Sequence, residues 1–165
     1  MALFALPLCL VAAGCGGSEL SVAAPQFHTA AGWHVGTQPN QACPGVSRSR
    51  CVQSNGWAST VAYRDCGDCV PPHRTLAALP PEGIVIQELN GTERPLKIGQ
   101  RPWPPRIHMR EVTGPFEGEP SQYGVFQYTA RTGSVERSLF VWFGRPHPTA
   151  QQLARANAEL RTVDP

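Results

Sequence analysis

The hydrophobic and polar positions along the chain predict a β-sheet in its second half. Residues 83–89 (GIVIQEL) contain an Ile-Val-Ile run and are followed by the turn signal Asn90-Gly91, which is typical of a buried strand. Residues 124–130 and 135–144 flank a short polar turn, and their alternating pattern predicts a β-hairpin. Both faces of the second hairpin strand are apolar, so we expect it to lie centrally in the sheet with one face under a helix.

A helix is predicted directly after the hairpin. Thr149 and Gln152 match an N-terminal capping box, in which each side chain accepts a hydrogen bond from the backbone N–H of the other residue. Four apolar residues recur on one stripe at helical spacing: Leu153, Ala156, Leu160 and Val163. We therefore expect an amphipathic helix over residues 150–163 whose apolar stripe covers the sheet.

Other segments have weaker patterns. Residues 27–37, 57–63 and 106–112 each alternate in character, and we expect a short strand in each of them. The second of these segments presents bulk on one face only, which places Trp57 in the core. Residues 74–79 predict a brief helical turn that two prolines then stop.

Composition agrees with a loop-rich globular domain. The 165 residues include 17 prolines and 16 glycines, which favour turns and limit helices. Only 16% of the residues are charged and the net charge is +2, so no nucleic-acid partner is expected. We predict an α+β fold in which a single antiparallel sheet is packed by the C-terminal amphipathic helix and tied by disulfides.

The first fifteen residues, MALFALPLCLVAAGC, indicate export. They carry no charge, and the apolar run is shorter than the about 20 residues of a transmembrane helix but matches the apolar segment of a signal peptide. The run ends in small residues followed by Cys15, which resembles the lipobox of bacterial lipoprotein signals. The resemblance implies cleavage before Cys15, a diacylglycerol on its sulfur, and a chain held at the membrane surface outside the cytoplasm.

On this interpretation the chain has three parts: a signal peptide (1–14), a lipidated cysteine with a flexible tether (15–26), and a single α+β domain (27–165). An ordinary cleaved signal peptide, which would leave a secreted protein, is the alternative. Both interpretations place the domain in an oxidising compartment of the cell envelope or beyond it, where disulfides persist.

Four cysteines remain for the folded domain once Cys9 leaves with the signal and Cys15 carries the lipid. They are Cys43, Cys51, Cys66 and Cys69. An even number of cysteines in an oxidising compartment predicts two disulfides. Three connectivities are open, and the sequence does not choose among them.

Cys66 and Cys69 form a C-x-x-C motif, which allows two further interpretations. One is an exported thiol–disulfide oxidoreductase, although Pro71 and Pro72 do not favour the helix N-terminus that lowers the thiol pKa in such enzymes. The other is a small metal-binding protein in which His73 completes a set of three ligands, although no second close pair of ligands accompanies it. A structural disulfide is the preferred interpretation.

The sequence contains no G-x-S-x-G motif and no phosphate-binding glycine loop. The preferred interpretation therefore includes no enzymatic activity, cofactor or metal. Trp103, flanked by Arg101 and Arg106 in RPWPPR, is a candidate partner surface; the alternative is a tryptophan folded down onto the core. The expected role is the binding of an envelope protein, a polymer or a small ligand.

The order of elements resembles a known architecture. Phe27, Gly32 and Trp33 form an F-x-x-x-x-G-W opening, and the hairpin over 124–143 runs into the helix over 150–163; this layout resembles the PsbP/Mog1-type α+β sandwich. The motifs GWHV and LPPEGIVI are also similar to small exported proteins of unassigned function in actinobacteria. Because proteins of the PsbP/Mog1 type mostly bind partners, the resemblance implies a binding or accessory role.

Overall fold

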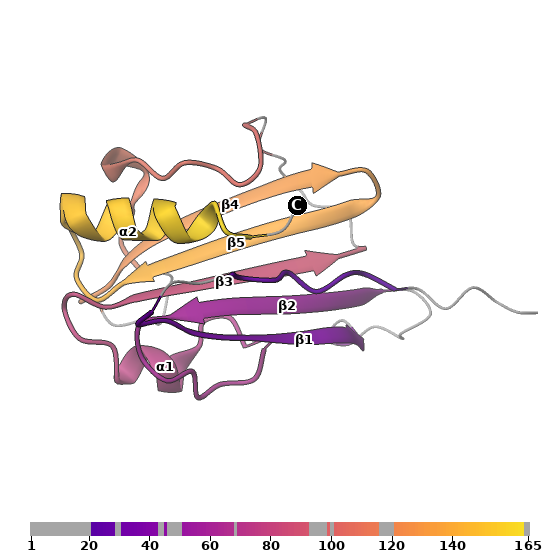
Figure 1. Cartoon of the computed structure of the whole chain (residues 1–165), viewed down its shortest axis with the longest axis horizontal. Coiled ribbons are helices and arrows are strands. Elements are labelled where there is room, and N and C mark those ends of the chain that lie inside the picture. The colour runs from indigo at the N-terminus through magenta and orange to yellow at the C-terminus, as the bar shows by residue number, and fades with distance from the viewer. Residues whose placement is uncertain are drawn as a thin grey trace, which may run out of the picture.

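A single five-stranded antiparallel sheet forms the centre of the molecule (Figure 1). The computed structural model describes residues 21–28, 31–42, 45, 51–67, 69–92, 99, 101–115 and 121–163. The strands lie in the order β1-β2-β3-β5-β4, and each pairs antiparallel with its neighbours. Their bounds are β1 (His34–Ala42), β2 (Val52–Ser59), β3 (Ile84–Gly91), β4 (Gly124–Thr132) and β5 (Val135–Phe143).

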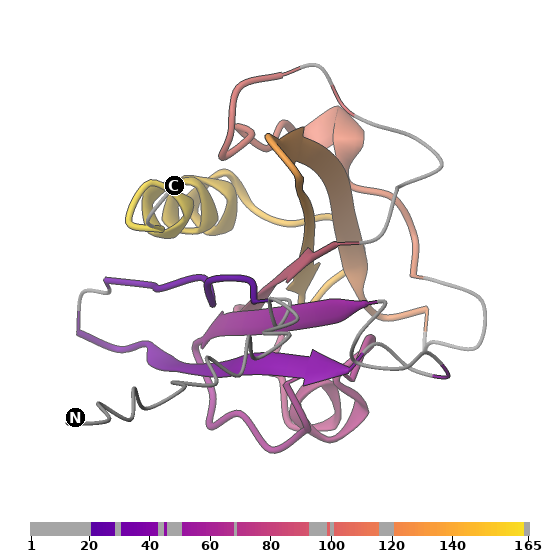
Figure 2. The same ribbon diagram turned by 90° about the vertical axis from the view of Figure 1, so that its right-hand side faces the viewer.

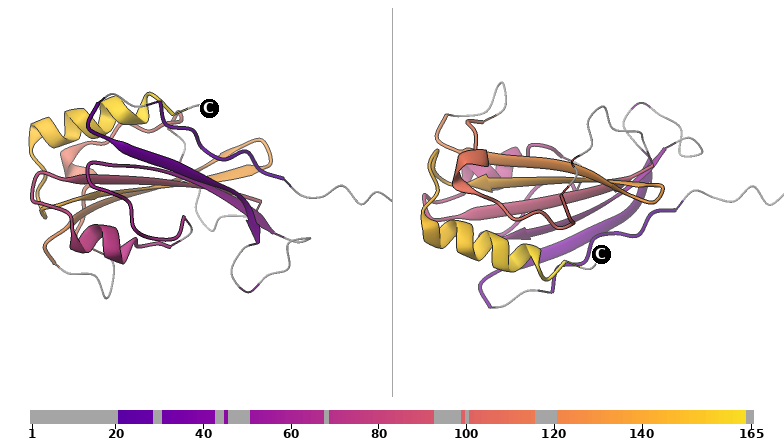
Figure 3. Two further views of the ribbon diagram at one scale, coloured as in Figure 1. Left: turned by 60° about the horizontal axis from the view of Figure 1, so that its bottom comes forward. Right: turned by 90° about the horizontal axis from the view of Figure 1, so that it is seen from above.

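Two helices cover opposite faces of this sheet, as Figure 3 shows most directly. Helix α2 (Ala150–Leu160) covers the face to which Ile84 and Ile86 of β3 point, and we call this the α2 face. The short helix α1 (His73–Ala77) covers the face to which Val85 points, the α1 face. Because successive side chains of a strand alternate between faces, β3 contributes to both layers of the core.

The predicted buried strand, hairpin and C-terminal helix are confirmed, although the helix ends at Leu160 and not at residue 163. The buried segment 83–89 is β3, and residues 124–143 form the β4–β5 hairpin. Strand β5 lies inside the sheet between β3 and β4, with Leu139 and Val141 buried on the α2 face and Trp142 buried on the α1 face. Apolar residues on both faces are what an interior, doubly covered strand requires.

The start of α2 is held by the predicted capping box. The Thr149 hydroxyl accepts a hydrogen bond from the Gln152 N–H at 3.1 Å, and the Gln152 side-chain oxygen accepts one from the Thr149 N–H at 2.9 Å. The Gln152 amide nitrogen also donates to the Pro81 carbonyl at 3.0 Å, in the turn before β3. The Gln152 side chain thus caps the start of the helix and ties it to the turn before β3.

The prediction of a strand over 106–112 is wrong. Ile107 is bound by a side chain of α2, and Met109–Glu111 form a 3₁₀ turn, η1, instead of pairing with the sheet. Only Thr113, just beyond, forms an isolated bridge with Val125 of β4. The alternation of polar and apolar residues in this segment reflects packing against α2 and not a strand ladder.

The strand predicted over 57–63 lies nearer the N-terminus in the structure, where β2 is Val52–Ser59. Strand β2 ends at Ser59, after which the chain turns so that Tyr63 stacks on Trp57 with the ring centroids 4.6 Å apart. Trp57 is therefore half-buried, not a core residue. The start of β2 contains a buried polar side chain that bonds to the backbone of the N-terminal segment. The Ser54 hydroxyl donates to the Val22 carbonyl at 2.5 Å.

The segment before residue 27 also packs on the sheet. Val22 is buried, and a Cβ atom added at Gly56 of β2 would lie 2.9 Å from the Pro25 Cβ. Only a glycine lets the N-terminal segment cross β2 this closely. The packed part of the chain thus begins ahead of the boundary at residue 27 that the sequence suggests. Figure 2 shows this segment running on the same side of the sheet as α2.

Candidate functional site

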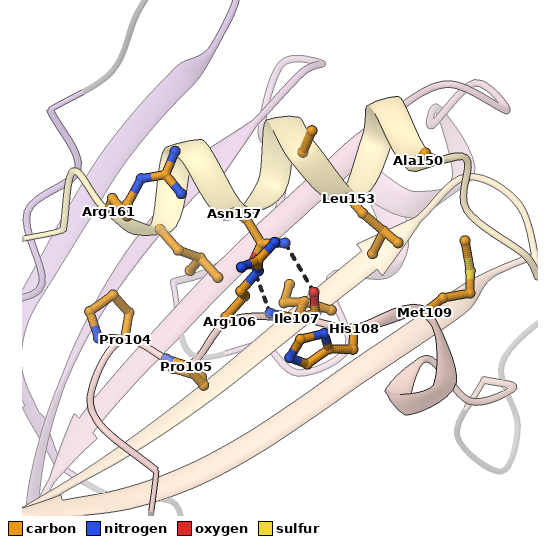
Figure 4. Close-up of a pocket in the computed structure, with 12 residues that line it drawn as sticks. Pro104, Pro105, Arg106, Ile107, His108, Met109, Ala150, Leu153, Asn157 and Arg161 are labelled. Atoms are coloured by element: carbon orange, nitrogen blue, oxygen red, sulfur yellow. Dashed lines mark hydrogen bonds between the residues drawn. The ribbon is translucent and has the colours of Figure 1, made fainter.

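A groove of about 620 Å³ runs between α2 and the segment 104–109 (Figure 4). Its volume lies within the about 300–1,000 Å³ that is usual for small-ligand sites. The lining comes from both walls: Pro104, Pro105, Arg106, Ile107, His108, Met109, Ala150, Leu153, Ala154, Asn157, Leu160 and Arg161.

Asn157 joins the two walls. Its side-chain oxygen accepts a hydrogen bond from the Ile107 N–H at 2.7 Å, and its amide nitrogen donates to the Ile107 carbonyl at 3.0 Å. Figure 4 shows both bonds at the middle of the groove, with Arg161 toward one end and Met109 toward the other. Because one side chain satisfies both backbone groups of Ile107, the distance between the walls is fixed there.

The inner surface of the groove is apolar. Ile107 and Leu160 are almost completely buried beneath it, and Leu153 packs partly against the same core. Met109 is 44% exposed, which makes it one of the most exposed large apolar side chains of the described residues. A ligand in the groove would therefore bury apolar surface of Leu153 and Met109, without a rearrangement of the core beneath them.

The charged and titratable groups of the groove are basic. Arg106, His108 and Arg161 are exposed residues of its lining, and none of the lining residues is acidic. The nearest described carboxylate on this segment, Glu111, accepts hydrogen bonds from the Arg101 guanidinium at 2.7 Å and from the His108 N–H at 3.0 Å. The positive charge of the groove is therefore not neutralised by its own lining.

The pKa of Glu111 reflects these contacts. Partial burial raises the pKa of this carboxyl, but the hydrogen bonds from His108 and Arg101 and the positive charge of Arg101 outweigh the burial and hold it below its usual value. Glu111 is therefore ionised at neutral pH and occupied by its donors, so it serves to position the segment and not to receive a proton.

Tyr128 of β4 holds the start of the same segment. Its hydroxyl accepts a hydrogen bond from the Arg101 N–H at 2.8 Å and donates to the Arg101 carbonyl at 3.1 Å. The Arg101 guanidinium lies 4.7 Å from the centre of the Tyr128 ring, a cation–π contact. The segment is thus fixed to the sheet by Tyr128 and to α2 by Asn157.

Trp103 is folded onto the core at the base of the groove wall. It is half-buried and packs against the buried cluster of the α2 face. Its ring lies 4.4 Å from the guanidinium carbon of Arg137 in β5 and 6.3 Å from the Tyr128 ring. Trp103 thus connects the groove wall to a charged pair inside the sheet.

That pair is Glu88 of β3 and Arg137 of β5. Two guanidinium nitrogens of Arg137 lie 2.7 and 2.8 Å from one carboxylate oxygen of Glu88, and both residues are buried. Loss of solvation dominates over the attraction of Arg137 and raises the pKa of Glu88 from 4.5 to about 7. The second carboxylate oxygen of Glu88 has no hydrogen-bond partner among the described residues.

The structure separates the three residues proposed as a partner surface. Arg101 is engaged by Glu111 and Tyr128, and Trp103 is engaged by Arg137, so both shape the groove wall from behind. Arg106 is exposed in the groove lining. Sequence reasoning missed Asn157 and Arg161, because no local pattern marks a helix residue whose partner lies fifty positions away.

The C-x-x-C motif lies on the other face of the sheet. Cys66 and Cys69 form a disulfide. Between them, Gly67 donates to the Gln38 side-chain oxygen at 2.8 Å and accepts from the Gln87 amide nitrogen at 2.5 Å. The motif is therefore fastened to two strands as a cover of the α1 face.

The disulfide is not at the start of a helix. Helix α1 begins at His73 after Pro72, and its first N–H groups are bound by Asp65, whose carboxylate accepts from Thr75 at 2.7 Å. This differs from the helix-terminal position that activates a redox cysteine. In the part of the chain that the structure describes, no three His, Cys, Asp or Glu residues are grouped to hold a metal ion.

The predictions for the other cysteines are covered by the structure only in part. Cys51 is disulfide-bonded, whereas Cys43 and Cys15 lie outside the described residues.

None of the helices within the described ranges is long and apolar enough to cross a membrane. Comparisons with family models, curated proteins and solved structures give no match to this chain.

Proposed function

We propose that this chain is an exported binding module of the cell envelope, anchored by a lipid on Cys15, with an α+β domain that has no catalytic role of its own. The apolar start of the chain and its Cys15 support export and anchoring. The groove between α2 and segment 104–109 is its binding site. The ligand is amphipathic, with an apolar part against Leu153 and Met109 and an acidic group between Arg106 and Arg161.

One observation carries this proposal: the lining of the groove combines an apolar floor with two arginines and a histidine, and contains no carboxylate. An apolar floor alone would take any hydrophobic group. Arginine side chains form strong charge-assisted hydrogen bonds with carboxylates and phosphates, so their position at the rim selects an acidic head. The rigid attachment of both walls lets the site bind without first ordering itself.

Blocking the groove tests this proposal. The probe is dodecanoate below its micellar concentration, titrated calorimetrically into the chain from residue 16 onward, which contains all of the described residues. Ala154 is exposed in the groove lining, so we expect Ala154→Trp to fill the groove and to weaken dodecanoate binding by about tenfold or more.

The matched control is Ala158→Trp. Ala158 is also exposed on α2 but does not line the groove, so this variant should bind dodecanoate as the wild type does. Dodecanol, which has the same chain without the charge, should bind more weakly. Equal affinity for dodecanoate in the two tryptophan variants, or no binding of dodecanoate at all, would overturn the proposal.

A further inference from the structure

The α2 side of the molecule presents more positive charge than the net charge of the chain suggests. The net charge is only +2. Five exposed basic residues nevertheless lie on α2, at its end and in the adjoining segment: Arg106, His108, Arg110, Arg155 and Arg161. They belong to adjacent elements, because Asn157 bonds α2 directly to the segment that carries the other three.

Described acidic residues do not offset this charge. Glu88 and Glu159 are buried, and Glu111 is engaged by Arg101. Glu136 contributes to a pocket on the α1 face, and Asp65 caps α1 there. The sixth, Glu82, is in the turn before β3 and not on α2 or its neighbouring segment.

The composition of the surface is also suited to a lipid interface. The exposed residues of α2 are small, neutral or basic: Gln151, Ala154, Arg155 and Ala158, with Arg161 directly after the helix. Met109, 44% exposed, stands among the basic residues of the neighbouring segment. Basic side chains around an exposed apolar one are the usual composition of a surface that lies in the headgroup region of a membrane.

We infer that this α2 surface, formed by α2 and residues 106–110, docks electrostatically on an anionic membrane surface. The described N-terminal segment 21–28 approaches from the same side of the sheet as α2 (Figure 2), so a lipid anchor on the preceding residues would favour this orientation. The docking surface shares Arg106, His108 and Arg161 with the groove lining, whereas Arg110 and Arg155 belong to the docking surface alone. If the proposed function holds, docking also brings the groove to the membrane, from which an amphipathic ligand would enter.

The experiment measures binding to vesicles by the chain from residue 16 onward, which lacks Cys15 and so carries no acyl anchor. The probes are phosphatidylcholine vesicles with and without about one third phosphatidylglycerol, at low and at near-physiological salt. We expect binding only to the anionic vesicles, with a marked decrease as salt rises, because screening shortens the range of the attraction.

The decisive variant is Arg110→Glu with Arg155→Glu, since neither residue lines the groove. Each removed arginine should weaken vesicle binding about fivefold, and the reversed charges should weaken it further. The matched control is Arg64→Glu with Arg74→Glu, two exposed arginines beside and within α1. The control makes the same change in net charge on the other side of the molecule, and it should retain most of the binding.

The two proposals fail separately. Ala154→Trp should lose dodecanoate but still bind anionic vesicles, whereas the Arg110/Arg155 pair should bind dodecanoate normally and lose the vesicles. Equal losses in the two arginine pairs would show attraction by net charge alone and would overturn the docking surface. Absence of binding to anionic vesicles at low salt would overturn it as well.

Discussion

The two faces of the sheet are covered by different means. On the α1 face the Cys66–Cys69 disulfide closes a loop on itself, and neutral hydrogen bonds of Gly67 with Gln38 and Gln87 hold this loop to the sheet. On the α2 face the cover is held by side chains of the sheet and helix, without a described disulfide, and it includes a charged pair buried beneath Trp103.

The α1 face therefore has a structural role, whereas the α2 face carries the candidate binding site. The cysteine motif, which is the most conspicuous chemistry of the sequence, closes the side on which a small helix seals the core. The groove lies on the opposite side, where the wall formed by segment 104–109 rests on Trp103 and Tyr128. A buried ion pair is costly to desolvate, so its presence under this wall favours a positioning role over a simple gain in stability.

The largest expected effect comes from breaking the pair under the groove. Arg137→Ala leaves Glu88 buried and unpaired, and should lower the free energy of unfolding by about 3–5 kcal/mol at pH 8, where Glu88 is ionised. Urea unfolding followed by circular dichroism measures this loss. The control is Arg74→Ala, which changes an exposed side chain of α1 and should alter the free energy of unfolding by less than about 0.5 kcal/mol. A loss below about 1 kcal/mol for Arg137→Ala would show that the pair does not hold this face together.

The next effect is a dependence of stability on pH. The pKa of Glu88 is about 7 in the folded protein and 4.5 ordinarily, so the folded state binds this proton more tightly. Its contribution to stability is fully present below about pH 4.5 and is lost as the pH rises through about 7, a change on the order of 3 kcal/mol.

Glu88→Gln removes the titrating group, and its urea unfolding at pH 5 and pH 8 should differ less than that of the wild type. Burial also raises the pKa of Glu159, which acts in the same direction, so the difference between the two proteins isolates Glu88. Identical pH profiles for wild type and variant would contradict the assigned pKa.

The smallest effect is expected on the α1 face. Replacing Cys66 and Cys69 with serine opens a loop closed over a sequence separation of 3, which should cost about 2 kcal/mol of stability in the chain-entropy model. Dodecanoate binding should not change, because the groove lies across the sheet. A change in binding would mean that the two faces are coupled, and an activity lost with the disulfide would return the C-x-x-C to consideration as a redox centre.

Local pattern was sufficient for part of the fold. Strand β3, the β4–β5 hairpin and α2 were predictable because their apolar periodicity and the Thr149 capping box are properties of neighbouring residues. The polar start of β2 was not, because Ser54 is buried by a bond to Val22, far away in the chain. The strand prediction for 106–112 was wrong for the same reason: the backbone of Ile107 bonds to the distant Asn157 side chain and not to a neighbouring strand.

The site was predictable only in fragments. Arg101, Trp103 and Arg106 drew attention as an aromatic residue among arginines, and all three do lie in or behind the groove wall. The helix side of the groove carries no such motif. The lining residues of α2 can be recognised only from the fold, because the groove forms where α2 packs beside segment 104–109.

The most direct test of the central claim is to locate the ligand on one face of the sheet. Backbone amide chemical shifts of the isotope-labelled chain from residue 16 onward, titrated with dodecanoate, report on both faces at once. We expect shifts that saturate at Ile107, Leu153 and Asn157, with Gly67 and Gln87 unchanged. Shifts centred on Gly67 and Gln87, or none at Ile107 and Asn157, would contradict the claim and place the binding site elsewhere.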